Sequence, residues 1–175
     1  MTGKKALRAA MLARRDAFRS MTAPDPAPLL ARLAPGATVA SYVPIGNEID
    51  PSPLLDAARA AGCRSALPFV VSRAEPIRFL LWDGALEPGP FGLSQPRADA
   101  PEVAPDVVIA PLVAFDRRGH RLGWGAGHYD RAFAALPDAF RLGVAWSVQE
   151  VEALEPDPWD VPLHAIVTET EWIVP

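Results

Sequence analysis

Residues 115–131 (FDRRGHRLGWGAGHYDR) bring glycines, arginines and aromatic side chains together at close spacing. Glycine alternates with larger residues from position 123 to position 127, and glycine lets a backbone take positive φ angles and approach a ligand closely. We expect this loop to run into a helix, whose first N–H groups lack partners and carry partial positive charge. With the fixed charges of Arg121 and Arg131, such a loop is suited to phosphoryl oxygens. The stretch therefore predicts a phosphate cradle.

This loop matches neither of the two common nucleotide-binding fingerprints. No Gly-Lys-Ser/Thr sequence follows it, as a Walker loop requires, and His128 stands where the dinucleotide fingerprint has its third glycine. Glycine spacing alone is also explained by a tight turn between a strand and a helix. The chemistry therefore has to be argued from more than the glycines.

Charged residues elsewhere could complete a site for a charged ligand. An anionic ligand could be held by the basic side chains that crowd the first helix-like stretch, which are Lys4, Lys5, Arg8, Arg14, Arg15 and Arg19. By spacing alone, however, Lys4 and Arg8 are better explained as a solvated helix face. Glu48 lies in a polar turn after a strand candidate. It is either a solvated loop carboxylate or a ligand-binding group.

Composition indicates a globular protein of one domain. The chain has 175 residues, 50% of them hydrophobic and 22% charged, and a chain of this size removes roughly two-thirds of its unfolded surface from water. The net charge of -4 argues against a general nucleic-acid binder. Cys63 is the only cysteine, so no internal disulfide can form. No apolar run reaches the roughly 18–20 residues that span a bilayer. We expect a cytoplasmic protein without a membrane partner.

Hydrophobic periodicity indicates the elements that must position these side chains. Helices are expected over residues 4–18, 29–33, 51–61 and 130–136, and strands over residues 37–43, 64–71, 77–82, 106–111, 142–146 and 165–168. The connection over residues 83–105 is rich in proline and glycine and is too long for a mere link, so part of it should fold.

The alternation of helices and strands predicts an α/β protein: a layered single domain, residues 1–175, with a mostly parallel central sheet flanked by helices. Ligands gather at the carboxyl ends of the strands in such sheets. The loops around Glu48 and Gly123 both follow strand candidates, so we expect them to face one site.

Residues 106–131 closely resemble the signature of the 5-formyltetrahydrofolate cyclo-ligase family. Residues 4–8 (KKALR) resemble the amino-terminal Lys-x-x-Leu-Arg element of that family, and residues 41–50 (SYVPIGNEID) resemble its strand-loop with a glutamate. Weaker similarities follow at residues 67–68, 91–96, 143–149 and 157–168. The resemblance covers nearly the whole chain in order, and its central motif is highly specific.

The resemblance implies an enzyme that closes 5-formyltetrahydrofolate into 5,10-methenyltetrahydrofolate, with ATP as co-substrate and Mg²⁺ as cofactor. In that reaction the formyl oxygen takes a phosphoryl group from ATP, the second folate nitrogen attacks the formyl carbon, and phosphate leaves. Catalysis then depends mainly on positioning and charge stabilisation.

The resemblance also assigns site residues. It implies catalytic roles for Arg121 and Arg131 and metal binding by Asp130 and Asp160. The ATP site would comprise Lys4, Lys5, Arg8, Arg121, Leu122, Gly123, Trp124, Gly125, Ala126, Gly127, His128 and Tyr129. The formyl-folate would be bound by Val43, Glu48, Trp124, Gly125, Gly127 and His128, with Glu48 accepting hydrogen bonds from the pterin.

Several of these residues also have a simpler explanation. Asp130 would complement the helix dipole from the first turn, and Arg131 would form a stabilising salt bridge. Tyr42 could cover the pterin but is better explained by core packing. His120 and His164 are expected to be structural.

The chain departs from the family pattern in the glycine loop, where the family more often has Gly-Tyr-Gly-Gly-Gly-Tyr-Tyr-Asp-Arg. Here Trp124 keeps an aromatic surface and His128 a planar polar one, whereas Ala126 would be strained by a positive φ angle.

There are two alternatives to the cyclo-ligase reaction. One is an ATP-dependent enzyme for another formylated or pterin-like substrate, and the other is a non-catalytic nucleotide- or folate-binding module. We expect small-molecule partners only and a monomer.

Overall fold

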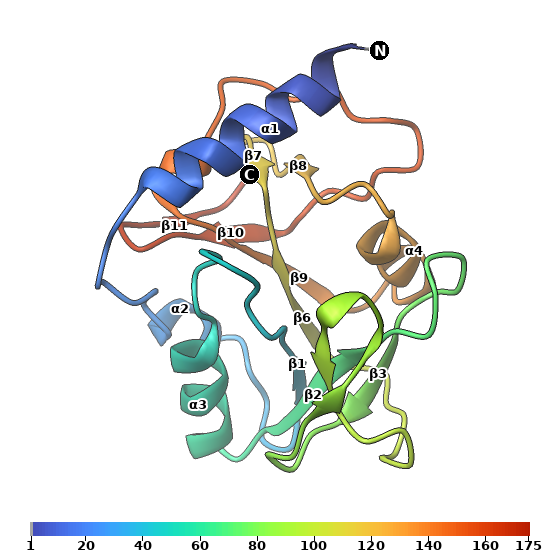
Figure 1. Cartoon of the computed structure of the whole chain (residues 1–175). Helices are drawn as coiled ribbons and strands as arrows, with labels where there is room; N and C mark the ends of the chain where they lie inside the picture. The colour runs from blue at the N-terminus through green and yellow to red at the C-terminus, as the bar shows by residue number, and fades with distance from the viewer. Residues whose placement is uncertain (1) are drawn as a thin grey trace.

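The computed structural model describes residues 2–175, which fold around a seven-stranded sheet with helices on both faces (Figure 1). The strand order is β11-β10-β9-β6-β1-β2-β3. The five inner strands pair in parallel, and β3 and β11 pair antiparallel at the two edges. The strands are β1 (Thr38–Ala40), β2 (Arg64–Phe69), β3 (Arg78–Leu81), β6 (Val107–Pro111), β9 (Phe140–Val144), β10 (Ala165–Val167) and β11 (Trp172–Ile173). The predicted α/β class with a mostly parallel sheet is confirmed.

Apolar side chains alternate along each inner strand, and this builds one hydrophobic layer on each face of the sheet. One layer joins Val39, Ile109 and Leu142 to α2 (Ala27–Leu30) and α3 (Ser52–Ala60). The other joins Ala40, Val108 and Ile166 to α4 (His128–Ala135). Because both faces of β6 are covered, its first four residues are all buried, as is typical of a central parallel strand.

Most element boundaries fall within a few residues of the sequence prediction. Gly62 ends the turn after α3 with a φ of 86°, as the expected left-handed cap requires. The long connection over residues 83–105 folds in part, into β4 (Glu87–Pro88), the 3₁₀ turn η1 (Pro90–Gly92) and β5 (Ser94–Gln95). Four short elements were not predicted, namely β7 (Ala114–Phe115), β8 (Arg121–Leu122), η2 (Ser147–Gln149) and β11.

Helix α1 (Thr2–Ala17) lies across the β7–β8 hairpin (Figure 1). Its apolar side packs on the hairpin through Met11, which is buried with Ala114 and Leu122. Residues spaced three, four or seven apart share one side of a helix. Lys4, Arg8 and Arg15 therefore face the same way as Met11, toward the body of the protein.

The order in which the chain adds strands to the sheet reverses between β1 and β6. From β1 the chain winds outward through β2 to β3, whereas from β6 it winds the other way through β9 to β10 and β11. Ligands of parallel α/β proteins bind at such a switch point, outside the carboxyl ends of the strands. The loop that leaves β1 contains Glu48, and the connection that leaves β6 passes through the β7–β8 hairpin into the glycine loop. Both predicted ligand loops therefore belong to connections that start at this point.

Candidate active site

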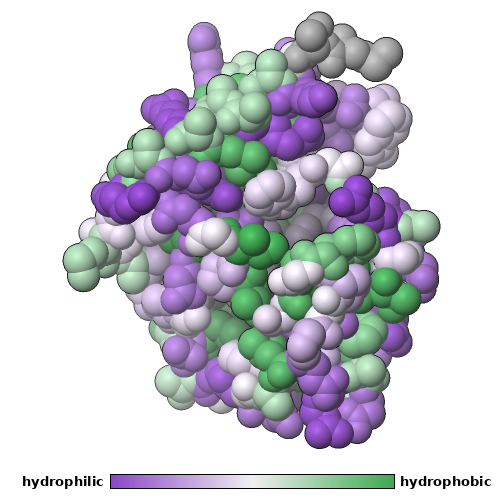
Figure 2. All heavy atoms as spheres, in the orientation of Figure 1, coloured by the Kyte–Doolittle hydropathy of each residue, from purple (hydrophilic) through white to green (hydrophobic). Residues whose placement is uncertain are grey.

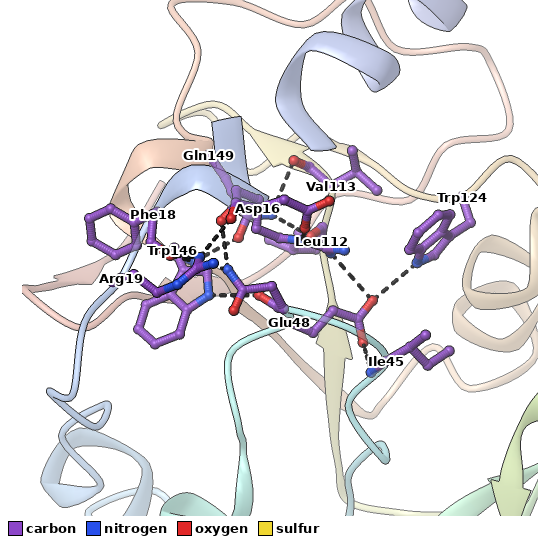
Figure 3. Close-up of polar contacts among 12 residues, drawn as sticks. Asp16, Phe18, Arg19, Ile45, Glu48, Leu112, Val113, Trp124, Trp146 and Gln149 are labelled. Atoms are coloured by element: carbon purple, nitrogen blue, oxygen red, sulfur yellow. Dashed lines mark hydrogen bonds and ion pairs between the residues drawn. The ribbon is translucent and has the colours of Figure 1, made fainter. Parts of the chain in front are cut away.

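Glu48 is the best-connected side chain of the loop after β1. Its side chain is only 4% exposed. One carboxylate oxygen accepts a hydrogen bond from the Ile45 N–H (2.9 Å), and the other accepts one from the Trp124 indole N–H (3.1 Å). Figure 3 shows Glu48 between these two groups. The Trp124 contact joins the two ligand loops directly.

Burial raises the pKa of Glu48, although the Ile45 and Trp124 N–H groups and the Arg15 cation oppose the rise. A carboxylate has about four acceptor sites, and two of them are used here. Glu48 can therefore still accept hydrogen bonds from a ligand with paired N–H donors.

The glycine loop has the backbone that the sequence predicts. Gly125 and Gly127 have φ angles of 98° and 66°, and Gly127 precedes the first residue of α4. Phe91 is the only non-glycine residue with a positive φ among residues 2–175, so Ala126 is unstrained. Arg8 of α1 donates to the Gly123 carbonyl (2.7 Å). The loop and the basic helix face are thus in contact.

Arg131 holds the glycine loop from outside. Its guanidinium donates to the carbonyls of Ala126 (3.0 Å) and Arg73 (3.1 Å) and lies 3.1 Å from the His128 Nδ1 atom. Burial and the Arg131 charge lower the pKa of His128. Arg131 is exposed, and its guanidinium N–H groups already bond to the glycine loop and to Arg73. This geometry supports a role in loop shape more than contact with phosphate.

Arg121 is buried on the other side of the loop, with 7% of its side chain exposed. It forms an ion pair with Asp130, donates to the Val161 carbonyl and packs over the Phe133 ring at 4.7 Å. Burial lowers the pKa of Arg121, while the charges of Asp130 and Asp160 oppose this. Both predicted metal carboxylates therefore lie close to this guanidinium.

Lys4 completes this charged group from α1. Its ammonium lies 2.6 Å from the Asp157 carboxylate and 3.5 Å from that of Asp160. Lys4, Arg121, Asp160 and Val161 line one narrow hollow. The hydrogen bond to Asp157 raises the pKa of Lys4, so its positive charge is held firmly.

Tyr129, in the first turn of α4, lies between the two halves of the site. It packs on Phe133, and its hydroxyl interacts electrostatically with both Glu48 and Arg121. Burial raises the pKa of Tyr129, so the phenol is neutral. Trp124 is 51% exposed at the mouth of the site. Figure 2 shows a hollow between the part that carries α1 and the lower half of the molecule.

Comparison with known proteins decides the family. A model of the 5-formyltetrahydrofolate cyclo-ligase family matches residues 1–169. The chain belongs to this family. It is 36% identical over 151 residues to the 5-formyltetrahydrofolate cyclo-ligase of Escherichia coli K12, covering 77% of this chain and 81% of that one. It is 34% identical over 152 residues to the cyclo-ligase of Mycolicibacterium smegmatis, covering 79% of this chain and 77% of the relative.

Solved structures agree with the cyclo-ligase assignment. The 5,10-methenyltetrahydrofolate synthetase of Aquifex aeolicus superposes with a TM-score of 0.76 at 30% identity, covering 98% of this chain and 92% of its own. The enzyme of that name from Mycoplasma pneumoniae superposes with a TM-score of 0.72 at 27% identity, covering 95% and 99% of the two chains.

Other residues assigned in this cyclo-ligase by sequence lie outside the contacts described above. Lys5 is exposed on a different side of α1 from Lys4, Leu122 is buried against α1, and Val43 is half-buried beside the Glu48 loop. Tyr42 belongs to the core and donates to the Ile49 carbonyl (2.6 Å), as core packing predicts. A separate hollow of about 610 Å³, at the start of β2, contains none of the assigned residues.

Both histidines expected to be structural have structural partners. His120 Nδ1 lies 3.1 Å from Asp116, a fully buried carboxylate that also accepts from the backbone N–H groups of Arg118, His120 and Leu154. His164 stacks on Phe140 and pairs with Arg141. Asp116 thus fixes the turn of the β7–β8 hairpin that presents Arg121.

Sequence reasoning missed a polar network behind the site of this cyclo-ligase (Figure 3). The Gln149 amide donates to the Leu112 and Val113 carbonyls, and its oxygen accepts from the Trp146 N–H. The Trp146 indole donates to the Asn47 carbonyl (2.9 Å). Asn47 in turn caps α1 by donating to the Arg15 and Phe18 carbonyls. These bonds tie the loops after β1, β6 and β9 to α1.

Replacing Gln149 by leucine should destabilise the protein by about 3 kcal/mol, because three buried backbone groups would lose their partners. Urea unfolding of Gln149→Leu and wild type measures the difference. Gln149→Glu is the matched comparison, since it keeps the acceptor but loses the donor. A loss below about 1 kcal/mol in the leucine variant would show that the network is not structural.

Proposed function

We propose that this cyclo-ligase closes 5-formyltetrahydrofolate into 5,10-methenyltetrahydrofolate at the switch point between β1 and β6, with ATP converted to ADP and phosphate. The observation that carries the proposal is the Trp124–Glu48 hydrogen bond, because it joins the glycine loop to the glutamate loop. A phosphate cradle and an acceptor for paired N–H donors thus share one site, as phosphoryl transfer from ATP to a pterin substrate requires.

The ATP half is supported by the groups around the glycine loop. The free N–H groups at the start of α4 and the open backbone at Gly125 and Gly127 suit phosphoryl oxygens. Arg8 already contacts this loop, and a Cβ added at Gly125 would lie 3.4 Å from its guanidinium. We assign Arg8 and Lys4 to the phosphates and Arg121 to the transferred group.

The folate half is supported by Glu48 and its neighbours. A pterin presents an amino group and a ring N–H side by side, and a carboxylate accepts both at once. The exposed Trp124 ring lies beside this carboxylate and can cover the flat pterin.

The reaction balances as two displacements. The formyl oxygen attacks the terminal phosphorus of ATP, which forms a P–O bond and breaks the bond to ADP. The second folate nitrogen then attacks the formyl carbon and closes the ring, and the C–O bond breaks as phosphate leaves and the nitrogen loses its proton to solvent. The protein positions the groups and stabilises charge on the phosphoryl oxygens.

Mg²⁺ fits the carboxylates of this site. Magnesium needs only one or two protein carboxylates and keeps several waters. Asp130 and Asp160 both lie close to Arg121, and their charges are balanced by Arg121 and Lys4. Residues 2–175 hold no cluster of three metal-binding side chains, so these two would suffice only with water and ATP oxygens. When bound, the ion would neutralise charge on the phosphates.

Gly127→Ala should raise the KM for ATP about tenfold, because an alanine at a φ of 66° costs roughly 1–2 kcal/mol and moves the loop. The added Cβ would also lie 3.2 Å from the Arg131 guanidinium. Steady-state kinetics with each substrate varied measure the effect. Gly36→Ala is the matched control, since Gly36 has a φ of 80°, open space around its Cβ and a place at the far end of β1. Equal KM values in both variants would contradict the cradle.

The test of the whole proposal is the near-ultraviolet absorbance of the protein mixed with 5-formyltetrahydrofolate, ATP and Mg²⁺, with controls that lack each one. We expect a methenyl product band that grows only in the complete mixture. ATP binding without product would instead favour another formylated substrate or a non-catalytic module.

We also propose that the chain acts as one domain, as a monomer and in the cytoplasm, where ATP is available. The family match over residues 1–169 supports the single domain. In residues 2–175, every helix is too short or too polar to cross a bilayer. Light scattering on the purified protein tests the monomer.

A further inference from the structure

Arg15 is the one arginine of α1 that is buried, with 3% of its side chain exposed. Its Nη1 atom lies 3.6 Å from the Glu48 carboxylate, and its guanidinium lies over the Trp124 ring at 5.6 Å. Arg15 therefore touches both residues that join the two ligand loops. No residue pattern in the sequence distinguished it from the exposed Arg14 beside it.

Two N–H-bearing atoms of Arg15 have no hydrogen-bond acceptor within the described chain. These are Nε and Nη1, and both are buried. Arg15 Nε lies 3.7 Å from the Asp16 carboxylate, which is too far for a hydrogen bond. A buried donor without a partner costs about 1–3 kcal/mol, and more when it is charged. Such a cost is relieved when a ligand supplies an acceptor oxygen.

The position of these free donors matches one edge of a pterin. Glu48 is an acceptor suited to the amino group and ring N–H of that edge, and the next atom along the edge of a 4-oxopteridine is a carbonyl oxygen. The Arg15 guanidinium lies next to the Glu48 carboxylate on the same side of the pocket. An acceptor and a donor side by side recognise a donor–donor–acceptor edge.

We propose that Arg15 is a specificity residue of the folate pocket, which positions the Glu48 carboxylate and donates to the 4-oxo oxygen of the pterin. The proposal rests on the proposed function, because it names how the same site recognises its substrate. It also means that α1 contributes side chains to both the ATP half and the folate half of the site. The helix contacts the glycine loop through Arg8 and the folate loop through Arg15, and the Asn47 side chain fixes its end to the loop that carries Glu48.

A purely structural role for Arg15 is a weaker explanation. A buried arginine that only stabilised the fold would be expected to use its donors on protein acceptors, because buried polar groups are nearly always hydrogen-bonded. The Thr38 and Ser41 hydroxyls and the Trp172 indole also lack partners in the described chain, but none of these is charged. Among residues 2–175, Arg15 alone places an unsatisfied buried cation beside the proposed ligand groups.

The test compares Arg15→Met, which keeps the volume, with Arg15→Lys, which keeps the charge. The exposed Arg14→Met is the matched control. Arg15→Met should raise the KM for 5-formyltetrahydrofolate by about 10- to 100-fold and leave the KM for ATP within about twofold. Arg15→Lys should recover part of the loss, and Arg14→Met should match wild type. Thermal unfolding of each variant confirms that it folds.

A pair of competing probes separates recognition from structure. 2-Amino-4-oxopteridine and 2-amino-4-thioxopteridine both keep the amino group and ring N–H proposed to face Glu48, and they differ in the acceptor atom at C4, where sulfur accepts hydrogen bonds more weakly than oxygen. Both are titrated at slightly acidic pH, where each keeps its ring N–H. Wild type and Arg14→Met should prefer the oxo compound by at least about tenfold, and Arg15→Met should lose that preference. A purely structural residue would weaken both probes equally, and that result would overturn the proposal.

Direct binding distinguishes this proposal from the proposed reaction. The probes are titrated against the fluorescence of the intact protein, without ATP. A wild type that binds and prefers the oxo probe but forms no methenyl product would support Arg15 and overturn the cyclisation. A wild type that forms product but shows no oxo preference, or no change in Arg15→Met, would overturn the role of Arg15 alone.

Discussion

Arg121→Ala should lower kcat by about a thousandfold and change the KM for 5-formyltetrahydrofolate by less than about threefold. The guanidinium is buried beside the glycine loop, where charge on a transferred phosphoryl group is screened least by solvent. Removing this guanidinium should therefore destabilise the transition state and leave folate binding nearly unchanged. Steady-state and single-turnover rates with both substrates measure the two effects.

The controls for Arg121 follow from its contacts. Arg121→Lys keeps the charge but cannot reach Asp130 and the Val161 carbonyl together, so it should recover only part of the rate. Arg117→Ala removes an exposed arginine of the same hairpin, which pairs with Glu150 and Glu171. Its kcat should match that of wild type. Equal and small changes of kcat and KM in Arg121→Ala would remove Arg121 from the phosphoryl-transfer step.

The fold and the main ligand loops could be predicted because their signals are local. An all-apolar run of five residues makes β6 a buried parallel strand, and the Gly-x-Gly-x-Gly spacing allows the two positive φ angles that shape the loop. Loops after parallel strands meet at one edge of the sheet, so the meeting of Glu48 with the glycine loop followed from topology. Trp124 supplies the hydrogen bond that joins them.

The partners of charged residues could not be predicted, because they depend on side chains far apart in the sequence. The basic residues of α1 look alike in the sequence, yet Lys4 pairs with Asp157, Arg8 contacts Gly123 and Arg15 is buried beside Glu48. Their different partners are decided by the packing of α1 on the β7–β8 hairpin. The short strands β7, β8 and β11 have two residues each and form through pairing, not through local propensity.

The pH dependence of folding offers a check on Glu48 that requires no ligand. Burial raises the pKa of Glu48 in the folded protein, so the folded state binds this proton more tightly than the unfolded state. The free energy of unfolding contributed by Glu48 therefore falls as pH rises from the ordinary glutamate pKa through the raised value. Glu48→Gln should lack this slope. Urea unfolding across that window, for both proteins, measures it, and identical slopes would mean that Glu48 is not shifted.

Glu48→Gln should weaken 5-formyltetrahydrofolate binding by about a hundredfold, because a charged acceptor for paired N–H donors is lost and the amide N–H₂ then faces one of the Ile45 and Trp124 donors. In wild type, folate affinity should also fall as pH is lowered through the raised pKa of Glu48, since protonation removes the same acceptor; the variant should show no such fall. The groups that face this carboxylate are Arg15 from α1, Trp124 from the glycine loop and Tyr129 from α4.

Titration calorimetry with 5-formyltetrahydrofolate at several pH values separates these effects. Asp50→Asn is the matched control, because Asp50 is an exposed carboxylate two residues away whose side chain accepts a hydrogen bond from the Ser52 N–H. Its affinity should stay within about twofold of wild type. If Glu48→Gln binds folate as tightly as Asp50→Asn does, the pterin is held elsewhere. The Trp124–Glu48 contact would then serve only to close the two loops onto each other.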